Sequence, residues 1–566
     1  MVCEGRLTGR SGDVGSPVGD LSRGSRDPRP AMETSSAASA SRVEIFQQPA
    51  ERLLPAAETP LPRLLAEQFI APGPGETSGR PLADRLLAAG SPAELLRAWA
   101  ATRIPPGERV DRDDLAALLG EDIASLDEAI GGQVDAILHH PRFRQLEAAW
   151  RGVQWLTEAA SSADTSGDGS GRVELRLLNV SKRELARDRD KAVEFDRSAL
   201  WRKIYEEEFG TAGGTPFGLL LADYEFGRHP DDVDLLTGLS EVAAAAFAPL
   251  LTRPAASLMG IDSLDRINTF NDLRQYQSAA EFAKWRSLRR REESRFVGLP
   301  LPGVLGRLPY DGWIGSADAP AAAERSFADR GFRYREQEDG TRLWIGAIWP
   351  LASVILHEFG RSGWFADIRG GSRGFAGGGQ VEHLPIDSFA GLRPGEAGRG
   401  PAEVVVTDAA QVQLEQAGLI PLCASGVDGR AIFHVNPSLH EPERFDKPEA
   451  NANAKISAML QYVLCVSRFA HYLKVIMRDK LGSFTEPVEL ERFLNDWLNQ
   501  YVTPDDRASP EVRARLPLRA GAVQVREEPG TAGAYRVVMH LQPHFQLDQI
   551  DATLRLVTTV IRQESR

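Results

Sequence analysis

Cysteine is scarce in this chain of 566 residues, which contains only three. Cys3, Cys423 and Cys465 lie far apart and form no C-x-x-C pair. The sequence therefore favours neither a disulfide framework nor a thiolate zinc site. This cysteine usage fits a reducing cytoplasm.

Long apolar runs and an excess of positive charge are also missing. The sequence contains no run of about 18 apolar residues, the length needed to span a bilayer. No apolar stretch near the N-terminus resembles a secretory signal, so we expect none. The 66 basic and 79 acidic residues give a net charge of −13. Because nucleic acids and anionic membranes select basic surfaces, we expect no nucleic-acid partner and no membrane insertion.

The remaining composition, 42% hydrophobic and 26% charged, is typical of a globular protein of two or three domains. Glycine, serine, alanine and proline dominate residues 1–77, which predicts a disordered N-terminal arm. Met32 lies inside this arm and is a candidate for the true translation start. We expect a helical segment at 78–160, an α/β core domain at 161–440 and a small α+β domain at 441–566.

Apolar periodicity supports these assignments. A helical stripe runs from Asp122 to Ala160 and is interrupted by Pro141. Strand patterns at Arg172 to Asn179 and at Phe217 to Tyr224 flank a helical segment, and the second strand is apolar throughout. This β-α-β order predicts a mixed sheet with helices on both faces.

The last 120 residues combine helices with a hairpin. One long helix is predicted from Asn451 to Lys480 and a second from Val488 to Tyr501. Alternating residues then predict strands at Ala522 to Glu527 and Tyr535 to Gln542, joined by EPGTAG, and a last strand follows at Ala552 to Ile561. Exposed strand edges recruit other chains, so this hairpin requires a partner or a cover.

Motifs for catalysis and metal binding fail on context. HEFGR (357–361) has Arg361 where a zincin needs its second histidine, and HEPER (440–444) ends in Arg444. GGSRG (370–374) spells G-x-S-x-G, but glycines follow where a nucleophile elbow requires a helix. His434, His440 and Glu441 lack ligand spacing. We expect no catalytic set, metal or cofactor.

The most basic run is KWRSLRRREESR (284–295), within a continuous charged helix predicted from Phe270 to Phe296. Nearby glutamates favour a salt-bridged helix face over a nucleic-acid site. The candidate contact residues on this helix are Arg286, Arg289, Arg290 and Arg291.

Several long strings resemble the large subunit of the type VI secretion contractile sheath, in order from about Asp122 to Val560. They are ILHHPRFRQLEAAWRGVQWL (137–156), LWRKIYEEEFGTAGGTPFGLLLADYEF (200–226), FVGLPLPGVLGRLPYDG (296–312), ANANAKISAMLQYVLCVSRFAHYLKVIMRDKLGSF (450–484) and RLPLRAGAVQVREEPGTAGAYRVVMHLQPHFQLD (515–548). One departure is Gly303, which stands where the family usually carries an arginine.

The resemblance implies a structural protein and not an enzyme. Its expected partners are a small sheath subunit in a heterodimer, neighbouring sheath subunits, an inner tube of hexameric rings, a baseplate and an AAA+ unfoldase that acts mainly through the small subunit. The expected location is the bacterial cytoplasm, in a sheath docked at the inner membrane through the baseplate. The alternatives are a phage-derived contractile particle and an enzyme of unrecognised class.

The resemblance also implies that strands near the C-terminus pair with strands of neighbouring subunits. The residues that it assigns to this pairing are Val523, Val525, Tyr535, Val537, Met539 and Leu541. The alternative is that the hairpin closes a sheet within its own domain.

Overall fold

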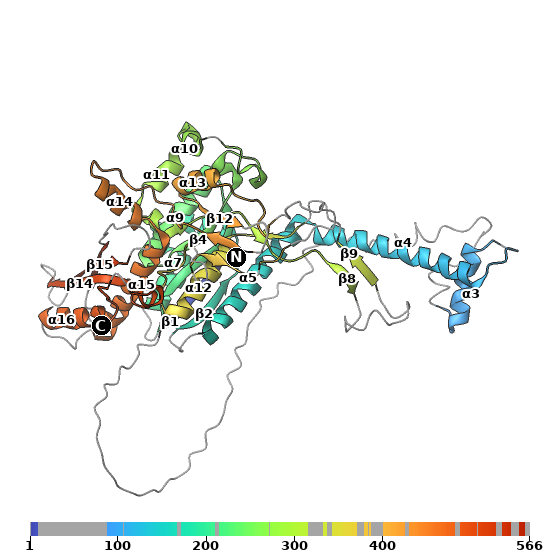
Figure 1. Ribbon diagram of the computed structural model, residues 1–566, viewed down its shortest axis with the longest axis horizontal. Helices are drawn as coiled ribbons and strands as arrows, with labels where there is room; N and C mark the ends of the chain where they lie inside the picture. The colour runs from blue at the N-terminus through green and yellow to red at the C-terminus, as the bar shows by residue number, and fades with distance from the viewer. Residues whose placement is uncertain are drawn as a thin grey trace, which may run out of the picture. The chain divides into compact units, whose positions relative to one another are not determined.

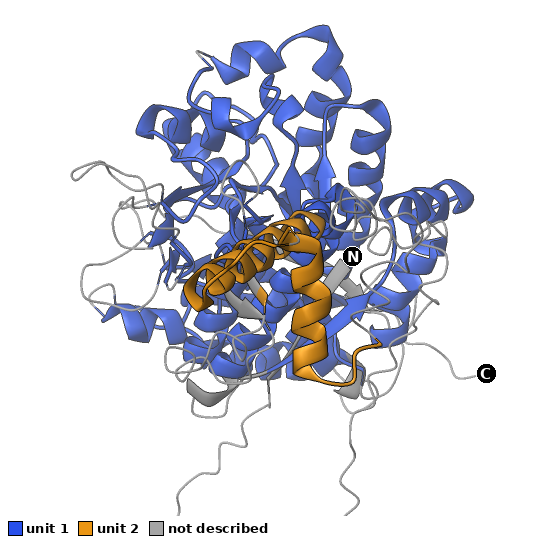
Figure 2. Cartoon of the chain, turned by 90° about the vertical axis from the view of Figure 1, so that its right-hand side faces the viewer, with its two compact units in different colours: residues 1–13, 135–312, 335–566 blue, residues 14–134, 313–334 orange. Residues whose placement is uncertain are grey.

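The computed structural model describes residues 2–9, 88–105, 107–166, 171–209, 214–270, 272–314, 332–336, 342–370, 378–382, 384–386, 400–424, 430–480, 487–505, 508–527, 535–544 and 554–560. The chain divides into two compact units (Figure 2). Unit 1 comprises Met1–Asp13, Asp135–Gly312 and Arg335–Arg566. Unit 2 comprises Val14–Val134 and Trp313–Tyr334.

Helices and strands alternate along most of the described chain (Figure 1). The helices are α3 (Pro92–Arg103), α4 (Arg112–Leu138), α5 (Pro141–Ser166), α6 (Lys182–Lys191), α7 (Ala199–Trp201), α8 (Glu207–Phe209), α9 (Pro230–Ala246), α10 (Leu273–Gln277), α11 (Ala283–Arg289), α12 (Ile348–Ser362), α13 (Asp408–Gln416), α14 (Pro448–Ser457), α15 (Leu460–Lys480), α16 (Pro487–Asn499) and α17 (Pro510–Arg515). Short helical turns are η2 (Phe195–Arg197), η3 (Arg202–Glu206), η4 (Ala256–Met259), η5 (Leu264–Arg266), η6 (Ala280–Phe282) and η7 (Glu292–Phe296). Among the helices described, none combines the length and the apolar character needed to cross a bilayer.

The strands form several small sheets. They are β1 (Val2–Gly9), β2 (Gly171–Leu178), β3 (Phe217–Phe226), β4 (Leu250–Pro254), β5 (Val297–Gly298), β6 (Pro300–Leu301), β7 (Val304–Leu305), β8 (Asp311–Ile314), β9 (Phe332–Arg335), β10 (Trp344–Ile345), β11 (Gln380–Val381), β12 (Ile420–Ala424), β13 (Ala431–Phe433), β14 (Leu518–Glu527), β15 (Tyr535–Pro543) and β16 (Leu554–Val560).

In unit 2, α3 is held to α4 by polar contacts. Ser91 caps α3 by accepting a hydrogen bond from the Glu94 N–H, and Pro92 occupies the first turn, where its missing N–H costs nothing. The indole N–H of Trp99 donates to Asp122 Oδ2 at 2.8 Å. Arg103 forms an ion pair with the same carboxylate. Asp122 of α4 therefore binds two side chains in the C-terminal half of α3.

A five-stranded mixed sheet forms the centre of unit 1, in the order β2-β1-β3-β4-β5. β3, β4 and β5 are parallel, while β1 is antiparallel to both of its neighbours. The first six residues of β3 are buried, because helices cover both faces of the sheet. Leu220 packs in one hydrophobic cluster with residues of α9, and Leu221 packs in another with residues of α5 and α12. The predicted α/β class with a mixed sheet is confirmed.

The disordered arm predicted for residues 1–77 is wrong for its first residues, because Val2–Gly9 forms β1. Cys3 lies opposite Leu177 of β2 and Leu221 of β3. Main-chain hydrogen bonding on both sides does not depend on apolar side chains, so composition alone gives no sign of this strand. The rest of the predicted arm, including Met32, lies outside the described residues.

Helices α5 and α12 approach closely at two glycines. A Cβ on Gly152 of α5 would lie 2.2 Å from Trp349 Cε2, and a Cβ on Gly360 of α12 would lie 2.7 Å from Ala163 Cβ. Trp349 is fully buried. At each of these positions the backbone of one helix lies directly against a residue of the other helix. Only glycine, which has no Cβ, permits so close an approach.

The predicted helix from Asn451 to Lys480 is two helices. α14 ends at Ser457 and α15 begins at Leu460. Between them, Met459 forms an antiparallel bridge with Pro437, and the Leu460 N–H donates to the Asn436 carbonyl at 2.8 Å. This main-chain pairing with a distant segment competes with the helical hydrogen bonds and interrupts the helix.

Candidate assembly interface

The terminal sheet has the order β14-β15-β16 and is antiparallel throughout. Val523 lies opposite Met539, and Val525 lies opposite Val537. This sheet contains all six residues that the resemblance assigns to pairing between subunits.

Five of those six side chains face the hydrophobic core of their own chain. Val537 and Met539 are 0% exposed. The five pack with leucines of α16 and with apolar residues of α15. The buried members of this cluster include Val523, Val525, Val537, Met539, Leu541, Leu490, Leu494, Leu498, Phe469 and Leu473. The side chain of Tyr535 lies outside the described part. Any pairing with another chain must therefore use main-chain groups and not these side chains.

The arginine cluster is mostly engaged within the fold. Arg286 donates to the carbonyls of Gln277 and Ala279 at 2.7 and 2.6 Å. Arg291 pairs with Glu241 of α9 at 2.6 Å.

Arg289 is buried and donates to the carbonyl of Leu439. Burial lowers its pKa to about 10. Arg290 is exposed at the end of α11. The predicted continuous helix is also wrong, because α11 ends at Arg289 and η7 follows. Of the four candidate arginines, Arg290 therefore remains the candidate for a charged contact with a partner.

Two basic residues of α15 contact segments that lie more than 200 residues away in the sequence. His471 Nε2 lies 2.9 Å from the Ala246 carbonyl, and burial lowers the pKa of His471 to about 3. The Lys474 ammonium lies 4.9 and 4.7 Å from the ring centroids of Tyr205 and Phe247. Burial lowers the pKa of Lys474 to about 8. His471 and Lys474 therefore lie buried against a carbonyl and aromatic rings, and we interpret their role as structural.

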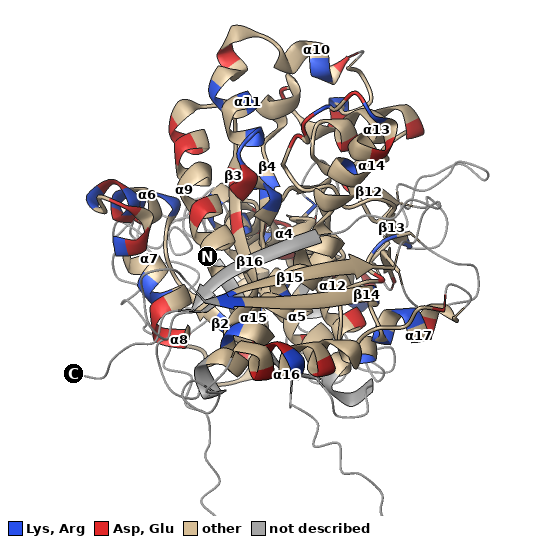
Figure 3. Cartoon of the chain, turned by 90° about the vertical axis from the view of Figure 1, so that its left-hand side faces the viewer, with Lys and Arg blue, Asp and Glu red and all other residues tan. Residues whose placement is uncertain are grey.

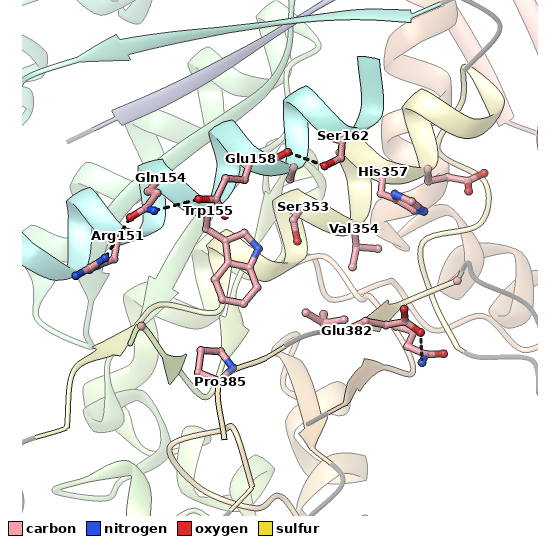
Figure 4. A pocket seen from close by; sticks show the side chains of 16 residues that line it. Arg151, Gln154, Trp155, Glu158, Ser162, Ser353, Val354, His357, Glu382 and Pro385 are labelled. Carbon is pink, nitrogen blue, oxygen red and sulfur yellow. Dashed lines mark hydrogen bonds between the residues drawn. The ribbon is translucent and has the colours of Figure 1, made fainter. Parts of the chain in front are cut away.

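A cavity of about 520 Å³ lies beside α5 and α12 and contains His357 and Glu358 of the HEFGR motif in its lining (Figure 4). Two other carboxylates in the lining accept hydrogen bonds from glutamine amides, Glu158 from Gln154 at 3.0 Å and Glu382 from Gln380 at 2.9 Å.

Glu358 of this cavity is held by the side chains that follow it. Arg361 and Ser362 donate to its carboxylate at 2.7 and 2.8 Å. Burial raises the pKa of Glu358 to about 7, and Arg361 partly offsets this rise. Arg361 also pairs with Asp367 at 2.9 Å. Arg361, at the position where a zincin has its second histidine, thus forms salt bridges with Glu358 and Asp367.

The other residues of the rejected catalytic and metal-binding motifs do not form a site among the described residues. His440 is buried, and its Nδ1 lies 2.9 Å from the Arg291 carbonyl. His434 is exposed. Ser372 lies outside the described residues. Within the described ranges no group of three His, Cys, Asp or Glu side chains is placed to hold a metal ion.

Two family descriptions match successive parts of the chain. Residues 120–440 match the EvpB/VC_A0108 tail sheath N-terminal domain, and residues 449–560 match the EvpB/VC_A0108 tail sheath gpW/gp25-like domain. The chain belongs to the EvpB/VC_A0108 tail-sheath family. The terminal sheet and helices α14 to α17 thus form its gpW/gp25-like part.

A relative of this tail-sheath protein is the type VI secretion system sheath protein TssC1 of Pseudomonas aeruginosa. The two are 36% identical over 443 residues, which are 77% of this chain and 84% of the relative. A crystal structure of a sheath tail protein from Desulfitobacterium hafniense aligns with 58% of this chain and 60% of its own length, at 11% identity and a TM-score of 0.26.

Sequence reasoning missed the polar face of α16 that lies against the outer edge of β14. Asn495 and Glu491 both accept hydrogen bonds from main-chain N–H groups of β14. Their signal in the sequence is two polar residues spaced by four within an amphipathic helix, which is indistinguishable from an ordinary solvated face.

Proposed function

We propose that this sheath-family protein is the large subunit of a type VI secretion contractile sheath. The observation that carries the proposal is the identity of 36% to the Pseudomonas aeruginosa sheath protein over most of both chains. Matches to both parts of the tail-sheath family support it. The protein then acts by assembly and not by turnover of a substrate.

The partners follow from this role. A small sheath subunit forms a heterodimer with the chain, and the heterodimers stack as a helical sleeve around an inner tube of hexameric rings. The sleeve lies in the bacterial cytoplasm, docked at the inner membrane through a baseplate. An AAA+ unfoldase recycles the contracted sleeve, mainly through the small subunit.

Contraction is a change between two packings of the same subunits, in which flexible connections move while paired strands stay closed. The terminal sheet of β14, β15 and β16 supplies main-chain groups for such pairing. The connection that we propose to move is the linker predicted around Thr503 to Pro517. The division of the chain at 78, 161 and 441 remains a prediction.

Co-expression tests the proposal. The full chain is produced with and without a small sheath subunit from the same organism, and negative-stain images are compared. We expect hollow striated tubules only from the pair. Tubules from the chain alone would favour a sheath of a phage-derived particle, and a monodisperse chain beside the small subunit would contradict the proposal.

A further inference from the structure

A groove of about 600 Å³ lies between helix α6, the segment that follows it and helix α9. Its lining includes buried apolar side chains of α6, α7 and α9, which are Leu185, Leu200, Leu235, Leu239 and Val242. Val193 and Phe195 also line the groove, and they are 88% and 38% exposed. The groove therefore offers apolar surface to a partner.

The charged side chains that line this groove are mostly acidic. Two are arginines and six are carboxylates, namely Asp188, Asp190, Glu194, Asp196, Glu241 and Glu293. Both arginines are already paired inside the groove. Arg189 lies 3.8 Å from the Asp190 carboxylate, and Arg291 lies 2.6 Å from the Glu241 carboxylate. The groove thus carries an excess of negative charge.

Two of these carboxylates remain available to a partner. Glu194 and Asp196 are exposed, and neither forms an ion pair with a basic side chain of the described ranges. Figure 3 shows further acidic residues, coloured red, along α6 and α9. A segment that fills the groove should therefore combine apolar side chains with basic ones.

A surface of this complementary kind lies on the first half of α5. Phe143, Leu146 and Trp150 are 37%, 56% and 51% exposed. Intervals of three and four residues place them in one row along the helix. Single exposed apolar residues are ordinary, but a row of large ones on one helix indicates a contact surface.

The charges beside this row are mainly basic. Residues 141–151 contain three arginines and one glutamate. That glutamate, Glu147, is already paired with Arg307 at 2.6 Å. Arg142 is exposed, and it forms no ion pair with an acidic side chain of the described part. The exposed face of α5 is therefore apolar and basic, where the groove is apolar and acidic.

The two surfaces lie on opposite sides of the central sheet. Leu239 of the groove belongs to the hydrophobic cluster that contains Leu220 of β3. Leu156 of α5 belongs to the cluster that contains Leu221. Because successive residues of a strand face opposite sides of the sheet, α5 and the groove of one chain are separated by the sheet. Only a second copy can bring an α5 to this groove.

We propose that the groove between α6 and α9 receives the exposed face of α5 from a second copy of this chain. Leu146 and Trp150 then cover the leucines of the groove, and the arginines beside them face its exposed carboxylates. The contact joins identical chains through two different surfaces, so it continues from copy to copy and builds an open helix. The inference rests on the proposed function, which requires such a helix.

Crosslinking between two variants tests the contact. Val193→Cys marks the groove and Leu146→Cys marks α5. The two variants carry different affinity tags and are assembled together with the small subunit, and a short bis-maleimide is applied. We expect a product that carries both tags from this mixture, and none above the parent level from either variant alone.

The matched control for this experiment is Val488→Cys, which replaces another exposed valine, at the start of α16. Mixed with V193C, it should give no product that carries both tags. Absence of the V193C–L146C product from tubules would overturn the proposal. A product between V193C and the small subunit would assign the groove to that subunit and overturn it equally.

Charge reversal gives a second test with its own rescue. Arg142→Glu changes only α5, and Glu194→Arg with Asp196→Arg changes only the groove. Each change should lower the yield of tubules several-fold while heterodimers still form, because like charges then meet. The chain that carries all three substitutions should regain tubules. Normal tubules from R142E, or a loss without rescue, would contradict the contact.

Failure of the proposed function has a different signature. The parent chain would then form no tubules with the small subunit at all. In that case the V193C–L146C product is sought in a concentrated mixture of the two purified variants. Its presence would support the contact between copies without a sheath, and its absence would overturn the contact as well.

Discussion

His471 illustrates how a single buried side chain ties folding to pH. Its ring lies among Phe209 and Phe247, with Nε2 at 2.9 Å from the Ala246 carbonyl. Its pKa is lowered to about 3, mainly by burial. No sequence pattern predicts this, because a histidine in the apolar stripe of a helix gives no information on the carbonyl opposite it.

We expect unfolding to become easier in acid because of His471. The unfolded chain takes up a proton near pH 6.5, whereas the folded chain resists it down to about pH 3. The unfolding free energy therefore falls with decreasing pH across this interval, by up to about 1.4 kcal/mol per pH unit. Urea midpoints of the wild type and His471→Gln should converge as the pH falls.

Exposed His434 supplies the control for this measurement. His434→Gln should follow the wild type at every pH. A pH dependence of the H471Q variant equal to that of the wild type would show that His471 is not the group responsible.

At the scale of the elements, the contact of α5 with α12 depends on residue size. Pro141 in the sequence predicted the interruption, and α4 indeed ends at Leu138 while α5 begins at Pro141. The apolar periodicity also correctly predicted the strand β3 and the helix α16. The close approach at Gly152 could not be predicted, because a glycine within a helix reads as weak propensity until the partner, Trp349, is known.

Gly152→Ala should destabilise unit 1. The added Cβ would lie 2.2 Å from Trp349 Cε2, and overpacking of this kind costs about 1–3 kcal/mol, more than the gain of up to about 1 kcal/mol in helix propensity. Urea unfolding followed by tryptophan fluorescence measures the loss.

Gly132→Ala in α4 is the matched substitution, since no atom beyond its chain neighbours and its own helix backbone lies within 4 Å of its Cβ position. It should be neutral or stabilising. A G152A variant as stable as the wild type would mean that α12 shifts freely relative to α5.

At the scale of the whole molecule, contacts between distant segments could not be predicted from the sequence. Alternation predicted the terminal strands and helical stripes predicted α16, but only the structure brings Asn495 onto the edge of β14. Composition predicted disorder at Val2–Gly9, which instead lies between β2 and β3. Both failures concern main-chain hydrogen bonds to remote partners, for which side-chain patterns carry little signal.

Removing residues 1–31 should loosen the central sheet. Without β1, the facing edges of β2 and β3 lose their shared neighbour, and unpaired main-chain groups in a buried sheet are costly. Hydrogen exchange of the segments 171–178 and 217–226 should rise in the truncated chain.

Removal of residues 14–31 alone, which keeps β1, is the control for the truncation. It should leave exchange in both segments unchanged. Equal protection in the full chain and in the chain lacking residues 1–31 would contradict a structural role for β1.

The carboxamide of Asn495 satisfies both outward main-chain groups of Val523. A strand that approached β14 at this position would find these hydrogen-bonding groups already occupied. Asn495 therefore protects the terminal sheet from unwanted strand addition along β14.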